Sequence, residues 1–162
     1  MAAGRAGCLI SFSTLAFSPD SRFIAVGFGN KVRIYNAFSW KSSRTLDNDK
    51  QPALAVAWSR DGSLLATASG NKILIWDTKT DTLLRTLSGH SLTVTNLAFG
   101  SDNILASGGF DTPVRLWNAN NGAWAGTLTF HSSRIRGLAF DATGKRLASG
   151  DNNGGIAIWR LP

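Results

Sequence analysis

One tripeptide recurs along the chain at a fixed interval. Each copy has an aliphatic residue, an alanine and an aromatic residue in that order: Leu15-Ala16-Phe17, Val56-Ala57-Trp58, Leu97-Ala98-Phe99 and Leu138-Ala139-Phe140. The copies begin at positions 15, 56, 97 and 138, which are 41 residues apart. A second marker, an aromatic residue before a polar or charged one, keeps nearly the same spacing: Tyr35-Asn36, Trp76-Asp77, Trp117-Asn118 and Trp159-Arg160. A period near 40 residues is typical of repeats that each form a four-stranded sheet.

The third unit shows the expected strands most clearly. Apolar and polar residues alternate over 94–99 and 114–117, an apolar run covers 104–107, and a last strand is expected at 124–128. Turn-forming Gly, Asn and Asp separate these segments, and this pattern predicts an antiparallel meander. We therefore expect an all-β fold, a β-propeller, with four blades in a single domain over 1–162. The predicted units are approximately 8–46, 49–87, 90–128 and 131–160.

The fourth unit ends before an outer strand. Residues 43–46, 83–87 and 124–128 supply that strand in the first three units, whereas only Leu161 and Pro162 follow Trp159-Arg160. The prediction is thus a partial propeller whose last blade lacks its outer strand. Three explanations stay open: a fragment of a larger propeller protein, a chain that pairs with itself or with another propeller chain to close a ring, and an open four-bladed structure.

The composition agrees with strands and turns. All ten acidic residues are aspartate, which favours turns, and the helix-forming glutamate is absent. The single cysteine excludes an internal disulfide, and neither a signal-peptide pattern nor a long apolar run is present, so we expect an intracellular protein, cytoplasmic or nuclear. The formal net charge of +7 has two interpretations: a solvated basic surface, or a basic face that binds nucleic acid or an acidic partner.

The third unit also carries a set of polar residues in a fixed order. Gly89-His90, Leu97-Ala98-Phe99, Leu105 to Gly108, Asp111 and Val114 to Asn118 together resemble the WD-repeat (WD40) family of β-propellers, and the resemblance extends over about 8–160. It implies a structural tetrad of hydrogen-bonded side chains. Its expected members in this unit are His90, Ser107, Asp111 and Trp117.

The other units depart from this tetrad to different degrees. In the fourth unit the corresponding residues are His131, Ser149, Asn153 and Trp159. The second unit keeps Thr67 and Trp76 but has Asp49 at the histidine position, and the first has Cys8 there. We therefore expect the first two units to be held by apolar packing rather than by the polar tetrad.

Enzymatic motifs are matched only by chance. Ser69 and Lys72 have the Ser-x-x-Lys spacing of β-lactamase-like enzymes, but that serine must begin a helix, and Ser69 precedes a turn between strands. Both histidines belong to the implied tetrad. We expect no catalytic residues, no metal site and no cofactor.

Binding is the remaining kind of function. The resemblance implies that partners dock on the loops that enter the first strand and that join the second strand to the third. The candidate partner-binding residues there are Phe28, Thr93, Thr95, Phe110, Arg134, Arg136 and Asn152. Two arginines that flank Ile135, together with exposed aromatic residues from other blades, suit an acidic or phosphorylated peptide. The alternative for both arginines is an ordinary solvent-exposed position.

The sequence thus predicts a non-enzymatic WD-repeat scaffold that binds a protein or peptide on its loop face. Two other functions stay open. One is a propeller associated with nucleic acid or ribonucleoprotein through its basic surface, and the other is a truncated fragment of a larger propeller protein.

Overall fold

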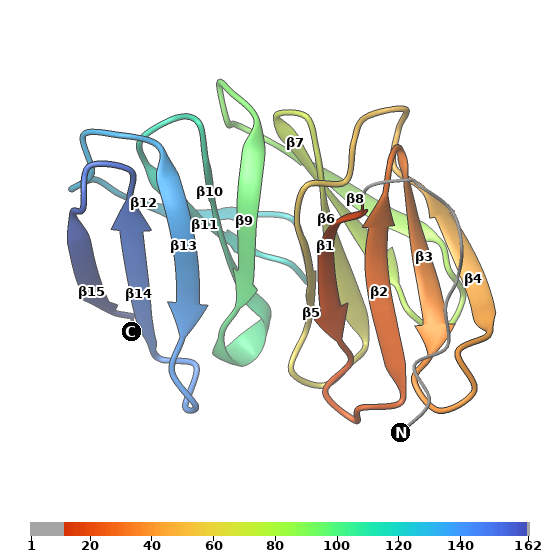
Figure 1. Ribbon diagram of the computed structural model, residues 1–162. Coiled ribbons are helices and arrows are strands. Elements are labelled where there is room, and N and C mark those ends of the chain that lie inside the picture. The colour runs from red at the N-terminus through yellow and green to blue at the C-terminus, as the bar shows by residue number, and fades with distance from the viewer. Residues whose placement is uncertain (1–11, 162) are drawn as a thin grey trace.

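The computed structural model describes residues 12–161, which form four antiparallel sheets placed in series (Figure 1). In each sheet, strands that follow one another in the sequence are hydrogen-bonded neighbours, so every unit is a meander. The first three sheets have four strands and the fourth has three within the described residues. The predicted all-β fold with four blades is therefore confirmed, and within residues 12–161 the fourth blade has no outer strand.

The first sheet contains β1 (Phe12–Phe17), β2 (Phe23–Phe28), β3 (Lys31–Asn36) and β4 (Ser42–Asp47). The second contains β5 (Val56–Trp58), β6 (Leu64–Ser69), β7 (Lys72–Asp77) and β8 (Leu83–Ser88). The third contains β9 (Val94–Phe99), β10 (Ile104–Gly109), β11 (Val114–Asn118) and β12 (Trp124–Leu128), with a 3-10 turn at Ser101–Asn103. The fourth contains β13 (Ile135–Phe140), β14 (Arg146–Asp151) and β15 (Ile156–Arg160).

Aspartate carboxylates organise the turns between first and second strands. In the first sheet, Ser18 Oγ donates to Asp20 Oδ1 at 2.6 Å and the Arg22 backbone N–H donates to the same oxygen at 3.0 Å. Asp61 accepts the equivalent bonds in the second sheet. These donors lower the pKa of both carboxyl groups. A short carboxylate reaches its own turn in this way, which explains why aspartate suits these two positions.

The core lies between the sheets. Each sheet has an aromatic face and an alanine face, and the aromatic face of one sheet packs on the alanine face of the sheet before it. In the third sheet the aromatic face contains Leu97, Phe99, Leu105 and Trp117, and it contacts the alanine face of the second sheet, with Ala57, Ala66, Ala68, Ile73 and Ile75. Equivalent clusters join the first sheet to the second and the third to the fourth.

This packing makes a mutational prediction. Leu105 is fully buried between the second and third sheets, whereas Leu84 on the outer strand β8 is 42% exposed. We expect Leu105→Ala to lower the free energy of unfolding by about 2–5 kcal/mol, because it removes buried methyl groups and leaves a cavity. Leu84→Ala should stay within about 0.5 kcal/mol of the unmodified chain. Urea denaturation followed by tryptophan fluorescence would measure both, and equal effects would contradict the proposed core.

Candidate functional site

A buried chain of hydrogen bonds crosses the third sheet. His90, in the linker before β9, places Nδ1 2.8 Å from Asp111 Oδ1 and Nε2 2.7 Å from Ser107 Oγ. The indole Nε1–H of Trp117 donates to the same Ser107 oxygen at 2.8 Å. These contacts fit a neutral imidazole with its proton on Nδ1, and burial lowers the pKa of His90. The structure thus brings together the four expected residues, and we interpret this network of hydrogen bonds as structural.

The fourth sheet has a similar chain with a different carboxylate. His131 Nδ1 lies 2.9 Å from Asp151 Oδ2, His131 Nε2 lies 2.7 Å from Ser149 Oγ, and Trp159 Nε1–H donates to that oxygen. The expectation that Asn153 fills the turn position is wrong, because its side chain is exposed and only its backbone N–H donates to Asp151.

Strand geometry explains this correction. Asp151 lies two residues after Ser149 on β14, and residues two apart on a strand point to the same face, so both side chains reach His131. The third sheet has Gly109 at the position of Asp151. A Cβ added there would lie 2.0 Å from the carbonyl oxygen of Thr93, so no side chain fits and the carboxylate comes from the turn.

The second sheet keeps a polar chain that the sequence analysis missed. Asn48 is fully buried: its Oδ1 accepts from Thr67 Oγ1 at 2.7 Å, and its Nδ2 donates to the Ala68 carbonyl at 2.7 Å. Trp76 Nε1–H donates to Thr67 Oγ1 at 3.1 Å. Asp49, at the histidine position, is exposed and lies 3.9 Å from Lys72, so this unit lacks the tetrad as expected and has the Asn48 hydrogen bonds beside its apolar packing. The corresponding Cys8 of the first unit lies outside the described residues.

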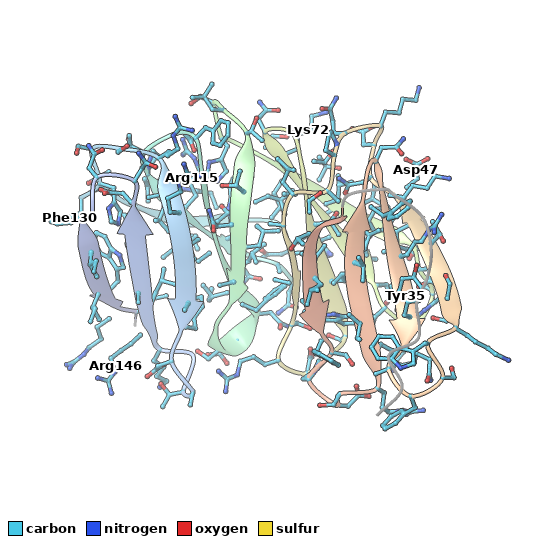
Figure 2. The ribbon with its side chains drawn as sticks, viewed as in Figure 1. Tyr35, Asp47, Lys72, Arg115, Phe130 and Arg146 are labelled. Atoms are coloured by element: carbon cyan, nitrogen blue, oxygen red, sulfur yellow. The ribbon has the colours of Figure 1, made fainter. Side chains whose placement is uncertain are left out.

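The candidate partner-binding residues lie along one edge of the sheets, which we call the loop face. It carries the turns between second and third strands and the linkers between sheets. Figure 2 shows Asp47, Lys72 and Arg115 toward this edge and Tyr35 and Arg146 toward the opposite one.

Four of the candidates form a connected group where the third and fourth sheets meet. The Arg134 guanidinium lies over the Phe110 ring, 5.1 Å from its centroid. Arg136 Nε donates to Asn152 Oδ1 at 2.9 Å, and the Asn152 backbone N–H donates to the carbonyl of Arg134. All four side chains are exposed. The remaining N–H groups of both guanidiniums are therefore open to solvent, and those of Arg134 lie beside an aromatic ring.

A β-bulge explains the position of Arg136. Ile135 pairs with Asp151 and Gly137 pairs with Gly150, so Arg136 is the extra residue of β13. Thr95 occupies the same bulge in β9. A bulged residue is not held in the regular alternation of the strand, and bulges commonly redirect a side chain near a functional site.

The other candidates relate to this group differently. Thr93 adjoins it, because its carbonyl accepts from the Phe110 backbone N–H at 2.9 Å. The Thr95 hydroxyl accepts from Asn96 Nδ2, which also bonds the Ile135 carbonyl. Phe28 lies apart on the first sheet, under the guanidinium of Arg33. Leu92, 52% exposed in the linker before β9, was not predicted, although an apolar residue one position before Thr93 was the available signal.

The exposed charges on the loop face are mostly basic. Its exposed bases are Lys31, Lys50, Lys72, Arg134 and Arg136, and its exposed acids are Asp47 and Asp49. Asp111 and Asp151 also lie near this edge, but each points inward to a histidine. The loop face therefore attracts anions.

The described residues contain neither a metal-binding cluster nor a membrane-spanning helix. Over 12–161, no group of three or more His, Cys, Asp or Glu side chains is placed to hold a metal ion. Within the same residues, no helix has the length and apolar character needed to cross a membrane.

Comparison with known proteins assigns the family. The model of the family described as WD domain, G-beta repeat matches residues 9–36, 40–77, 81–118 and 122–160. The chain belongs to the WD40 repeat family. The second, third and fourth matches each begin just before the outer strand of one sheet and end with the third strand of the next sheet. The repeat in sequence therefore spans two sheets. No curated protein sequence matches the chain.

Solved structures share the WD40 fold. The structure of U3-55K and that of the RRP9 WD40 repeats each superpose with a TM-score of 0.85 at 24% sequence identity. Each alignment covers 96% of this chain and 50% of the other, so the chain spans about half the length of these structures. At this identity the likeness shows the fold alone.

The buried amide of the second sheet gives a discriminating prediction. Asn48→Ala should lower the free energy of unfolding by about 1–3 kcal/mol, because it leaves the Thr67 hydroxyl and the Ala68 carbonyl without their partner. Asp49→Ala, next to it in sequence but exposed, should change stability by less than about 0.5 kcal/mol. Chemical denaturation of both variants measures the difference, and a larger effect at Asp49 would contradict the assignment of Asn48.

The pKa values of His90 and Asp151 also predict that the free energy of unfolding decreases in acid. Burial lowers the pKa of His90 below its ordinary value of 6.5, and the hydrogen bond with His131 lowers the pKa of Asp151 below 3.8. In both cases the unfolded chain takes up a proton at a pH where the folded chain does not, so stability falls as pH falls. The His90 contribution is complete above pH 6.5 and is lost toward the lower folded-state pKa.

Urea midpoints measured at several pH values between about 7.5 and 4.5 would check this expectation. His90→Asn should reduce the part of the decrease that begins near pH 6.5. A midpoint that stays constant or rises as the pH falls over this range would contradict a lowered pKa for His90.

Proposed function

We propose that this WD40 chain is a non-enzymatic binding module that holds an acidic or phosphorylated protein segment on its loop face. The observation that carries the proposal is the connected group at the meeting of the third and fourth sheets. There the Arg134 guanidinium stacks on Phe110, and the bulged Arg136 is oriented by Asn152.

This arrangement suits a peptide with an anionic group beside an apolar side chain. A guanidinium donates two parallel hydrogen bonds to a carboxylate or phosphate, and stacking on an aromatic ring holds it in place before the partner arrives. Phe110 and Leu92, 44% and 52% exposed, offer apolar contact next to the charges. The arginine charges orient the bound peptide and raise its association rate. The apolar residues add affinity that salt does not remove.

A second candidate function rests on the charge of the whole chain. The net charge of +7 and the exposed lysines Lys31, Lys50 and Lys72 extend the basic surface away from Arg134, which suits a nucleic-acid phosphate backbone. Salt separates the two functions. The logarithm of the affinity for a phosphate backbone falls linearly and steeply with log[salt]. The affinity for a peptide partly held by Phe110 should depend on salt less steeply.

The proposal also includes the domain organisation of the chain and its location in the cell. Residues 1–162 act as one domain, which is supported by the continuous cores between successive described sheets. The single cysteine and the basic charge support a cytoplasmic or nuclear module.

Charge reversal tests the proposed site. Peptides selected from a library of acidic and phosphorylated sequences by binding to the full chain would be compared on Arg134→Glu and Arg136→Glu variants by isothermal titration calorimetry. We expect each substitution to raise Kd at least about tenfold, because a charge-assisted hydrogen bond contributes about 1.5–3 kcal/mol. Arg146→Glu, on the opposite edge of the sheets, is the matched control and should leave Kd within about twofold.

Phe110→Ala should weaken the same peptides with little change in the slope of log Kd against log[salt]. Unchanged affinity in all three loop-face variants would show that the partner binds elsewhere. Equal weakening by Arg146→Glu, or a slope as steep as for a single-stranded oligonucleotide, would favour a general basic surface instead.

A further inference from the structure

The outer strands of the first two sheets each carry an arginine that points toward the following sheet. Arg44 on β4 and Arg85 on β8 occupy the same register position against the third strand of their sheets. Each lies two residues before a buried leucine, Leu46 or Leu87, that belongs to the core shared with the next sheet. Residues two apart on a strand point to the same face, so both arginines face the following sheet.

The contacts of Arg44 show what this arginine position binds. Its Nη1 donates to Asp81 Oδ1 at 3.0 Å and to the backbone carbonyl of Thr78, both in the turn between β7 and β8. The guanidinium also lies over the Phe23 ring, 5.2 Å from its centroid. The ligand of the arginine is therefore a carboxylate that comes from the following sheet.

Arg85 faces a turn that lacks this carboxylate. Gly122 occupies the position of Asp81: the backbone N–H of each donates to the carbonyl four residues earlier, and each has a positive φ, 58° for Asp81 and 77° for Gly122. A Cβ added to Gly122 would lie 3.1 Å from Arg85 Cδ, so the arginine passes directly beside the glycine. Arg85 is half-buried, and over residues 12–161 no hydrogen bond or ion pair engages its guanidinium.

An exposed tryptophan borders the same place. Trp124 pairs with Trp117, which belongs to the core between the second and third sheets, and cross-strand partners share a face. The indole Nε1–H of Trp124 donates to Thr127 Oγ1 at 3.3 Å, and the side chain is 63% exposed. The second sheet has Leu83 at this position. We call the place defined by Arg85, Gly122 and Trp124 the outer junction.

Two differences change the charge of this junction in the same direction. It has a glycine where the contact between the first and second sheets has Asp81. It has Arg115 where that contact has Leu74, at the third-strand position that pairs with a threonine of the outer strand. The first difference removes a negative charge and the second adds a positive one. The outer junction therefore attracts an anion.

We propose that the outer junction is a binding site in which an acidic side chain of a partner protein gives Arg85 the carboxylate that Asp81 gives Arg44. The partner segment carries an Asp or Glu next to an apolar residue. Its carboxylate accepts parallel hydrogen bonds from the guanidinium, and its apolar side chain packs on the exposed ring of Trp124.

This site is separate from the group on the loop face. Gly122 belongs to the turn between β11 and β12, and the turns between third and fourth strands lie at the edge opposite the turns between second and third strands. The inference therefore does not depend on Arg134 or Phe110.

The test begins with a library of peptides that each contain one Asp flanked by varied apolar residues. Peptides are selected for binding to the full chain with Arg134→Glu and Arg136→Glu, and isothermal titration calorimetry compares them on further variants of that chain. Arg85→Gln should raise Kd at least about tenfold, because it removes a charge-assisted hydrogen bond. Trp124→Ala should raise Kd about fivefold, whereas Leu83→Ala, the equivalent change in the second sheet, should leave it within about twofold.

Two variants of one residue test the carboxylate itself. Asp and Asn have nearly the same shape, and both are among the residues that adopt a positive φ most readily. Gly122→Asp places a carboxylate beside Arg85 within the chain, so it should exclude the peptide and raise Kd at least about tenfold. Gly122→Asn should raise Kd less than about threefold. This pair keeps the test decisive if circular dichroism shows that Arg85→Gln is unfolded.

Equal weakening by the two Gly122 variants would mean that crowding and not charge excludes the peptide, which overturns the inference. A library that yields no binder, or peptides whose Kd is unchanged by Gly122→Asp, would overturn it as well. Acidic peptides that bind the unmodified chain, ignore Arg134→Glu and are weakened by Arg85→Gln would support the outer junction and overturn only the proposed function.

Discussion

Packing of one sheet face on the next sheet is the interaction on which this structure depends. Each sheet is a small meander that has little interior of its own, and its apolar residues become buried only when another sheet covers them. The tripeptide that repeats along the chain serves both contacts, because its aliphatic and aromatic residues face the preceding sheet and its alanine faces the following one. The 41-residue period is thus the spacing of a contact surface.

In the second, third and fourth sheets, polar networks tie the linker before the first strand to the second and third strands. They differ in chemistry, with a histidine in the third and fourth sheets and an amide in the second, but each ends on a hydroxyl that also accepts from a tryptophan. A buried imidazole needs a carboxylate and a hydroxyl to satisfy both nitrogens, whereas a buried amide is satisfied by a hydroxyl and backbone carbonyls and carries no charge. The hydrogen bonds of Asn48 therefore involve no proton uptake of the kind that makes the His90 network sensitive to acid.

Sequence reasoning succeeded where a regular period decides the structure. The strands of the third unit were found from alternation and turn signals, and the four residues of the His90 chain were found through the resemblance to the WD-repeat family. It failed where the direction of a side chain decides which residue takes part in a buried hydrogen bond. Asn48 and Asp49 are adjacent, and only the backbone shows which of them points inward. Asp151 replaces Asn153 because β14 continues far enough to place Asp151 on the same face as Ser149. Contacts between loops, such as Arg134 on Phe110, join residues that no local pattern relates.

The bulge at the start of β9 and of β13 has a wider consequence. Thr95 and Arg136 are extra residues within their strands, so their side chains are not required by either packing face. A substitution at such a position leaves the cores between sheets intact. The fold thereby separates two kinds of position: those that must stay constant for the sheets to stack, and a small set at the rim that is free to vary with the partner.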